Sequence, residues 1–288
     1  MTPSFAVGDI QVQRIVEVAQ PFMSPGSMFP EATDDDVAAH RHWLEPHALC
    51  PDSGKLIMTI QSYLVRTARH VILIDTCVGC GKDNAWFAPW HRRTDAGWLA
   101  RLAAAGVAPG DVDYVFCTHL HLDHCGWNTR LLDGRWVPTF PNARYVMARA
   151  EVAHGEANPN TVWTESVAPV IAAGQALVVD DGYALDDQVW LEPTPGHTAG
   201  HVGVCLASNG QRAIMTGDMI HSPLQCHFPD WTFRHDFDPR QAQATRRAVL
   251  EDACESGRLV MTAHFPAPSA GHVAARGDTF DFTYLANA

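Results

Sequence analysis

Histidine and aspartate side chains recur along this chain at spacings that suit the binding of metal ions. The densest group lies in the segment THLHLDH at 118–124, and further candidates follow at His197, Asp218 and His264. Neutral imidazoles and carboxylates are ligands that Zn²⁺ prefers, and crowding them together costs free energy unless a cation binds them. The pattern predicts a hydrolytic centre for two divalent metal ions, with zinc as the expected metal. Its seven candidate ligands are His119, His121, Asp123, His124, His197, Asp218 and His264.

The backbone at 118–124 explains how one short segment can serve two metal ions. Side chains alternate along an extended backbone, so His119 and His121 project to the same side and can bind one ion. Asp123 and His124 come next, where the chain must turn, and can reach a second ion beside the first. A lone His-x-His pair is commonly a surface coincidence, whereas the longer run after a buried strand is a specific signal. The later candidates can supply the remaining ligands and a carboxylate that bridges the two ions.

Strands and helices alternate around the candidate ligands. Runs rich in β-branched and apolar residues predict strands at 10–17, 56–66, 70–75, 113–117, 144–147, 189–192, 201–206, 212–215 and 259–262. Helical spacing predicts a helix at 95–105, and the N-cap residue Asp238 followed by Pro239 predicts another at 238–256. The candidate ligands follow strands, so we expect sheets flanked by helices, with the site at one edge of the sheets. No repeat or linker interrupts the chain, and we expect a single domain over residues 1–288.

The composition excludes several classes of protein. Hydrophobic residues make up 47% and charged residues 18% of the chain, which are values of a globular protein. A formal net charge of −12 argues against nucleic acid as a partner, because no basic patch is available to release counterions. No apolar run approaches the roughly 20 residues needed to span a bilayer, so we expect no membrane partner. The segment from Met1 to Ser4 lacks the basic and apolar regions of a secretory signal, and we expect a cytoplasmic protein.

Eight cysteines are scattered along the chain, and only Cys77 and Cys80 form a CxxC pair. No second pair follows to complete a structural zinc site, and this pair lies in a glycine-rich turn after an expected strand. We therefore expect small buried thiols here, in preference to a redox or zinc role.

The motifs resemble those of the metallo-β-lactamase superfamily, and the match extends from the first expected strands to the last candidate histidine. The resemblance implies an αββα sandwich, an α/β fold with a dinuclear metal site at one edge of its two sheets. It also implies which ligands bind which ion, with Asp218 bridging the two. The first metal ion is bound by His119, His121 and His197. The second is bound by Asp123, His124 and His264. In the segment PGHTAGH at 195–201 the first histidine is the ligand, which leaves His201 with a structural role.

The superfamily includes enzymes of several activities, and individual residues discriminate among them. Asp218 as the bridging carboxylate argues against true β-lactamases, which usually place Cys or Ser there. The acidic chain is a poor match to nucleases, which handle polyanions. The remaining resemblance is to the N-acyl-homoserine lactonases and to organophosphorus hydrolases of the methyl parathion hydrolase type. We therefore expect a metal-dependent hydrolase that opens a lactone or ester, with organophosphorus triester hydrolysis as the alternative.

Two further activities stay open at this point. Thioesterases of the superfamily append a basic helical region, whereas only residues 265–288 follow His264. Persulfide dioxygenases use one iron ion and need fewer ligands than the complete set of seven found here. Members that act only as binding or scaffold subunits typically lack some of these ligands, and this chain lacks none.

The lactonases commonly carry a tyrosine three residues after the bridging aspartate, where this chain has His221. His221 either donates a hydrogen bond to a reacting oxygen of the substrate or packs beside the site. In the expected mechanism, a water between two metal ions is acidified to hydroxide and attacks the substrate carbonyl or phosphorus. Asp123 is placed to hold or move the proton. The expected catalytic side chains are therefore Asp123 and His221.

Clustered aromatic and methionine side chains predict an apolar cleft for a small, uncharged substrate. The expected pocket residues lie in loops near the metal edge and are Phe22, Met23, Trp86, Phe87 and Trp163. Alternatively, these side chains belong to the hydrophobic core or to a dimer contact. Loops of this kind form dimer contacts in related proteins, so we also expect a homodimer.

Overall fold

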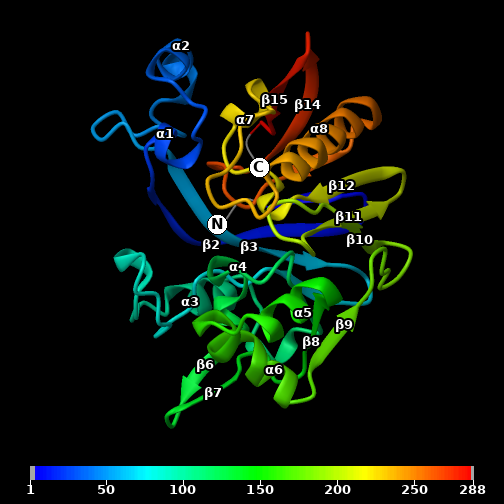
Figure 1. The fold of residues 1–288 in the computed structure, drawn as a ribbon. Helices are drawn as coiled ribbons and strands as arrows, with labels where there is room; N and C mark the ends of the chain where they lie inside the picture. Colours follow the sequence, from blue (N-terminus) through cyan, green and yellow to red (C-terminus); the bar gives the residue numbers. More distant parts are fainter. Residues whose placement is uncertain (1–3, 287–288) are drawn as a thin grey trace.

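The computed structural model describes residues 4–286, and most of its strands form two sheets that pack face to face (Figure 1). The expectation about a secretory signal falls mainly on Met1 to Pro3, which lie outside the described residues. The first sheet has seven strands, in the order β1-β2-β3-β4-β5-β8-β9. Their bounds are β1 (Ser4–Val7), β2 (Ile10–Pro21), β3 (Ile57–Arg66), β4 (Val71–Ile74), β5 (Tyr114–Phe116), β8 (Arg144–Ala148) and β9 (Ala176–Val179).

The second sheet has six strands in sequential order, from β10 to β15. Their bounds are β10 (Val189–Pro193), β11 (Val202–Ser208), β12 (Gln211–Met215), β13 (Leu259–Met261), β14 (Ala270–Arg276) and β15 (Thr279–Tyr284). A separate hairpin of β6 (Thr129–Leu132) and β7 (Arg135–Pro138) projects at the bottom of the view in Figure 1.

Parallel pairing brings the carboxyl ends of several strands to one edge of the molecule. In the first sheet β4, β5, β8 and β9 run parallel to one another, whereas β4 is antiparallel to β3. In the second sheet β12 and β13 are parallel, and the other neighbouring strands are antiparallel. The loops that follow β4, β5, β12 and β13 therefore emerge together, and these loops carry most of the candidate ligands.

Helices cover the outer face of each sheet. Those between β2 and β9 are α1 (Pro25–Met28), α2 (Asp34–Leu44), α3 (Gly97–Ala104), α4 (Leu122–Cys125), α5 (Arg149–Ala157) and α6 (Ala168–Ala172). Those between β12 and β13 are α7 (Leu224–His227) and α8 (Pro239–Ser256). The short 3-10 helices are η1 (Ala88–Trp90), η2 (Pro109–Asp111), η3 (Gly126–Asn128) and η5 (Gly217–Met219). The segment η4 (Trp163–Val167) is a short π-helix.

Three apolar clusters hold these layers together. The cluster between the sheets joins side chains such as Val65 and Phe116 of the first sheet to Leu191 and Val204 of the second. A second cluster packs α3, α5 and α6 on the outer face of the first sheet. A third packs α8 on the outer face of the second sheet, through side chains such as Leu250. The result is the αββα sandwich expected from the sequence.

Most of the expected elements are present with shifted ends. The expected helix at 95–105 is α3, and the one at 238–256 is α8. At the start of α8 the Asp238 side chain accepts a hydrogen bond from the Gln241 backbone (3.0 Å), and at its end Gly257 has a φ of 67°. Several elements were not expected, including β1, β9, β14, β15, α2, α5 and the β6–β7 hairpin.

Among residues 4–286, no helix is both long enough and apolar enough to cross a membrane.

Candidate metal centre

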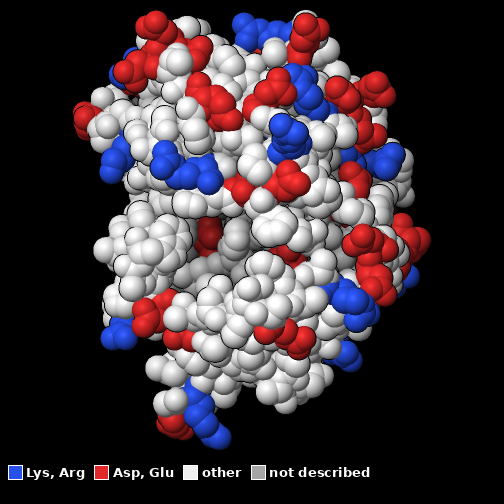
Figure 2. All heavy atoms as spheres, viewed as in Figure 1, with Lys and Arg blue, Asp and Glu red and all other residues white. Residues whose placement is uncertain are grey.

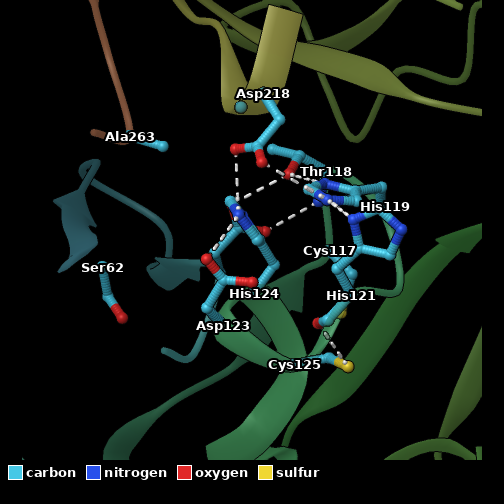
Figure 3. A network of polar contacts seen from close by, with 12 residues as sticks. Ser62, Cys117, Thr118, His119, His121, Asp123, His124, Cys125, Asp218 and Ala263 are labelled. Carbon is cyan, nitrogen blue, oxygen red and sulfur yellow. Dashed lines mark hydrogen bonds and ion pairs between the residues drawn. The ribbon is translucent and has the colours of Figure 1, made fainter. Parts of the chain in front are cut away.

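All seven candidate ligands meet at the edge where the two sheets open toward solvent. His119 and His121 lie in the turn between β5 and α4, and Asp123 and His124 lie in α4 itself. The others follow strands of the second sheet: His197 lies between β10 and β11, Asp218 in η5 after β12, and His264 after β13. Figure 3 shows part of this convergence, with Asp218 facing the histidines that follow β5.

Three histidines and one oxygen of Asp218 form a first group. His121 Nδ1 lies 3.0 Å from His119 Nε2 and 3.0 Å from His197 Nε2. Asp218 Oδ2 lies 3.8 Å from His119 Nε2 and 3.4 Å from His197 Nε2. Four potential ligand atoms therefore lie within reach of one metal ion.

A second group gathers around the other oxygen of Asp218. Asp218 Oδ1 lies 2.9 Å from His124 Nε2 and 2.8 Å from His264 Nε2. Asp123 Oδ2 lies 3.7 Å from His124 Nε2 and 3.8 Å from His264 Nε2. The two oxygens of one carboxylate thus face two separate groups of nitrogen atoms, in the division that the family resemblance implies.

Two buried polar atoms of these ligands lack hydrogen-bond partners, which indicates whether the site fits divalent metal ions. His124 Nε2 and Asp218 Oδ1 are buried without a hydrogen-bond partner within residues 4–286, although they lie 2.9 Å apart. Burying such groups without partners is costly, and a metal ion between the donors removes that cost. Imidazole and carboxylate are also the donors that zinc prefers. The residues present therefore fit divalent metal ions.

Electrostatics in the two groups also favour bound cations. Burial lowers the pKa of His119 and His197 well below the usual range and that of His121 to about 3, so these rings are neutral and their lone pairs are free. Burial also opposes charge on His124, but the carboxylates of Asp218, Asp123 and Asp75 together outweigh it and hold the pKa of His124 well above its usual range. Positive charge is therefore favoured beside Asp218.

Further side chains orient the ligands, and the sequence did not reveal them. Asp75, which follows β4, accepts hydrogen bonds from the Thr118 backbone (2.8 Å) and hydroxyl (2.9 Å), and its Oδ2 lies 2.8 Å from His124 Nδ1. Asp236 Oδ1 lies 2.9 Å from His197 Nδ1. Such partners fix the ring orientation and tautomer of metal-binding histidines.

His201 lies beside the centre but does not face it. Its Nε2 accepts a hydrogen bond from the Asp218 backbone (2.9 Å), and its Nδ1 lies 2.8 Å from the Thr194 hydroxyl. Burial lowers the pKa of His201 to about 3, so the neutral ring can accept this bond. The ring holds the backbone of Asp218 in place.

His221 lines the cavity beside both groups, with its ring centre 5.0 Å from that of His197 and 5.6 Å from that of His264. Its ring stacks on Phe233 at 4.0 Å, and its Nε2 lies 3.2 Å from Asp218 Oδ2. Neither ring nitrogen has a hydrogen bond within the described chain, although both are buried. The backbone of His221 donates to Gln225 (2.8 Å), which fixes its position. The ring thus places a nitrogen without a hydrogen bond beside the Asp218 carboxylate.

A cavity of about 340 Å³ opens onto the centre. Two of the expected pocket residues, Phe22 and Trp86, line it, and so do Asp123 and His221. The sequence did not single out its other apolar wall residues, which include Met58, Leu120, Leu122, Val162 and Phe233. In the face shown in Figure 2 the surface is hollowed near its centre, and acidic side chains are visible inside a rim of mostly uncharged residues.

The expected pocket residues Met23, Phe87 and Trp163 do not line this cavity. Met23 is half-buried and packs against the hydrophobic cluster on the outer face of the first sheet. Phe87 packs behind the wall, at 4.9 Å from both Phe22 and Trp90. Trp163 lines a second cavity of about 210 Å³, which also reaches His121.

The expectation of buried thiols at the CxxC pair agrees with the structure. Cys77 is fully buried and burial raises its pKa well above the usual range, while Cys80 is half-buried and donates to the Arg93 carbonyl (3.1 Å). No cysteine of residues 4–286 belongs to a disulfide or to a metal-binding group.

Comparisons with known proteins identify the family of this chain. The model of the family described as Metallo-beta-lactamase superfamily matches residues 58–264. N-acyl homoserine lactonase AiiA of Bacillus thuringiensis subsp. kurstaki is 23% identical over 228 residues, which cover 75% of this chain and 85% of that protein. N-acyl homoserine lactonase AttM of Azorhizobium caulinodans is 42% identical over 59 residues, only 20% of this chain and 19% of that protein.

Solved structures share the fold over nearly the whole chain. The hydrolase AbOPH of the beta lactamase superfamily has a TM-score of 0.83 at 22% identity, covering 99% of this chain and 97% of its own. AidC, a dizinc quorum-quenching lactonase solved with a product, has a TM-score of 0.77 at 21% identity, with the same coverage of both chains.

Proposed function

Because the chain belongs to the metallo-beta-lactamase superfamily, we propose that it is a dinuclear zinc hydrolase that opens small apolar lactones or esters. It is a lactonase-like hydrolase of this superfamily, and its centre fits divalent metal ions. One observation supports the proposal of two metal ions and an apolar substrate. The two oxygens of Asp218 face two groups of ligands at the base of an apolar cavity.

The two metal ions would be held by the seven candidate ligands, with Asp218 between them. When bound, such ions supply Lewis acidity, which activates water near neutral pH and polarises a substrate oxygen. The protein must then bind the substrate, orient it and manage one proton. Phe22, Trp86 and Phe233 supply apolar walls that exclude water from one side of the substrate.

Asp123 and His221 are the side chains that we assign to the chemical step. The Asp123 side chain is 11% exposed and lines the cavity, where it can hold the proton released from the attacking water. A protonated ring nitrogen of His221 can donate to the oxygen on which negative charge develops. Phe233 stacks on His221 and keeps that ring edge directed at the cavity.

A second candidate function, organophosphorus triester hydrolysis, is favoured by the shape of the site. The larger and smaller cavities share Leu120, His121, Asn160, His197 and His235 along their common boundary. A phosphotriester carries three substituents around the reacting atom, and two adjoining cavities offer room for more than one of them.

A substrate panel tests both functions. Purified protein loaded with zinc would be assayed with acyl-homoserine lactones, simple lactones, aryl esters, phosphotriesters, a thioester and a β-lactam. We expect the highest turnover on a lactone or aryl ester, lower turnover on triesters, and none on the β-lactam. A preparation with two metal ions per chain that hydrolyses no lactone or ester would overturn the first proposal. Full hydrolytic activity with one metal ion per chain would overturn the dinuclear part of the proposal, whereas one iron ion per chain with no hydrolysis of any substrate would favour the dioxygenase alternative.

A further inference from the structure

One buried carboxylate outside the metal groups contacts two separate ligand loops. Glu151 lies in the first turn of α5 and is 7% exposed. Its Oε2 accepts a hydrogen bond from the Leu120 backbone (3.1 Å), and its Oε1 accepts one from the Gly200 backbone (2.9 Å). Both oxygens are therefore engaged by backbone N–H groups.

The two loops are those that carry the three histidines of the first metal group. Leu120 lies between His119 and His121, and Gly200 lies three residues after His197. His121 and His197 are 76 residues apart in the sequence, yet their ring nitrogens lie 3.0 Å apart. Because one carboxylate binds both loops, it fixes the distance between them.

Close packing leaves little freedom at this junction. A Cβ atom at Gly200 would lie 2.7 Å from the Glu151 backbone nitrogen, so the loop rests directly on the first turn of α5. The positive end of the dipole of α5 and the two backbone hydrogen bonds stabilise the buried carboxylate. A neutral side chain of the same size could not accept both bonds in the same way.

The second metal group is held by different contacts. Asp75 lies 2.8 Å from His124, and the Thr59 carbonyl lies 2.8 Å from His264 Nδ1. Neither contact involves Glu151 or α5. Loss of the Glu151 carboxylate should therefore disturb the first group more than the second.

We propose that Glu151 is a positioning residue that sets the geometry of the first metal group, formed by His119, His121 and His197. This inference rests on the proposed dinuclear function, since it assigns Glu151 to one of its two metal sites. In this role Glu151 is not a metal ligand, and it acts through the backbones of Leu120 and Gly200.

Glu151→Gln is the test, with Glu156→Gln as the matched control. Gln keeps the size of the side chain, but its amide N–H₂ would face one backbone N–H instead of accepting from it. Glu156 lies on the same helix and is exposed. The zinc affinity of each group is measured separately by competition with a chelator, after one ligand of the other group has been removed. His264→Ala weakens the second group, so that zinc binding at the first can be measured, and His119→Ala serves the second group in the same way.

We expect Glu151→Gln to weaken zinc binding at the first group by roughly 10- to 100-fold, the range for partners that orient metal ligands. Binding at the second group and at both groups of Glu156→Gln should change by less than about threefold. The absorption spectrum of the cobalt-substituted first group should also change, and thermal unfolding of the metal-free protein checks that the variant folds.

Equal weakening of both groups, or an unchanged first group in a folded variant, would overturn the proposal. If Glu151→Gln fails to fold, Glu151→Asp provides the same test, because its shorter carboxylate cannot reach both loops. Wild-type protein that binds two zinc ions without hydrolysing any lactone or ester would contradict the proposed substrate alone. Wild-type protein that binds no second metal ion would contradict the dinuclear function itself.

Discussion

The two carboxylate oxygens of Asp218 face different groups of imidazoles, and this single side chain links them. Asp218→Asn should therefore remove most hydrolytic activity, because an amide offers only one oxygen and cannot bridge two cations equally. We expect kcat/KM to fall by more than about 100-fold, the upper range for residues that only orient ligands. Metal analysis should find fewer than two ions per chain.

The control for this change is Asp278→Asn, which alters an exposed carboxylate in the turn between β14 and β15. It should leave activity and metal content unchanged, while circular dichroism confirms that both variants are folded. Asp218→Asn protein with wild-type kcat/KM and two metal ions would show that Asp218 does not bridge.

His221 has a buried ring with no hydrogen bond of its own within the described chain, next to Asp218 and Phe233. His221→Phe keeps an aromatic ring against Phe233 but removes the donor. If His221 donates to the reacting oxygen, kcat should fall by roughly 10- to 1,000-fold, the effect of one lost transition-state donor. Steady-state kinetics on a lactone and an aryl ester, with metal content measured in parallel, check this.

Unchanged kcat in the metal-loaded His221→Phe protein would leave His221 with a packing role only. A rise in KM at constant kcat would indicate instead that the ring binds the ground-state substrate as strongly as the transition state.

The sequence predicted the candidate ligands better than the residues that orient them. His119 to His124 could be recognised because their spacing alone identifies a metal-binding run. Asp75 could not, because it lies 43 residues from Thr118 and 49 residues from His124, and only the parallel pairing of β4 with β5 brings them together. Glu151 was missed for the same reason, since its partners are backbone groups of two other loops.

At the scale of elements, the end of α8 offers a clean test of backbone conformation. Gly257 has a φ of 67°, and a Cβ atom added there would meet no other atom within 4 Å. Any cost of Gly257→Ala must therefore come from the left-handed backbone, and we expect about 1 kcal/mol lower stability. Urea unfolding of the metal-free protein measures this free energy.

Gly257→Asn is the matched comparison, because Asn adopts the left-handed region more readily than Ala. Its loss of stability should be smaller than that of Gly257→Ala. Equal stability of Gly257→Ala and the wild type would show that this helix end relaxes to another conformation.

Local signals for two missed elements were present in the sequence. Thr33 and Asp36 form a capping box at the start of α2, with Thr33 accepting from the Asp36 backbone and the Asp36 carboxylate accepting in return. Asp133 and Gly134 both have positive φ in the turn between β6 and β7, which is typical of a tight hairpin. By contrast, β9 is a half-buried edge strand whose partner, β8, can be identified only from the tertiary fold.

At the scale of the whole molecule, a buried lysine joins three segments that are distant in the sequence. Lys82 is 1% exposed, and its Nζ lies 3.6 Å from the centre of the Trp136 ring. It donates to the Thr129 hydroxyl (2.6 Å) and to the Glu165 carbonyl (2.9 Å). No carboxylate forms an ion pair with it within residues 4–286, so burial lowers its pKa to about 7.

This lysine should make stability depend on pH. In the unfolded chain a lysine keeps its proton up to about pH 10.4, whereas the folded protein releases it above about pH 7. Between these values the unfolded state binds more protons, so this group makes the free energy of unfolding rise with pH. Below about pH 7 both states are protonated, and the full cost of burying the charge is present.

Lys82→Met removes that charge while keeping a long, flexible side chain against Trp136. The variant should gain stability relative to the wild type at pH 6, by at most about 5 kcal/mol, with the two lost hydrogen bonds reducing the gain. The difference should shrink steadily toward pH 10, where the wild-type amine is neutral when folded. Urea unfolding of both metal-free proteins at pH 6, 8 and 10 checks this, since every other titrating group is common to the two. A difference that stays constant over this range would mean that Lys82 keeps its charge when buried, held by Thr129, Glu165 and the face of Trp136.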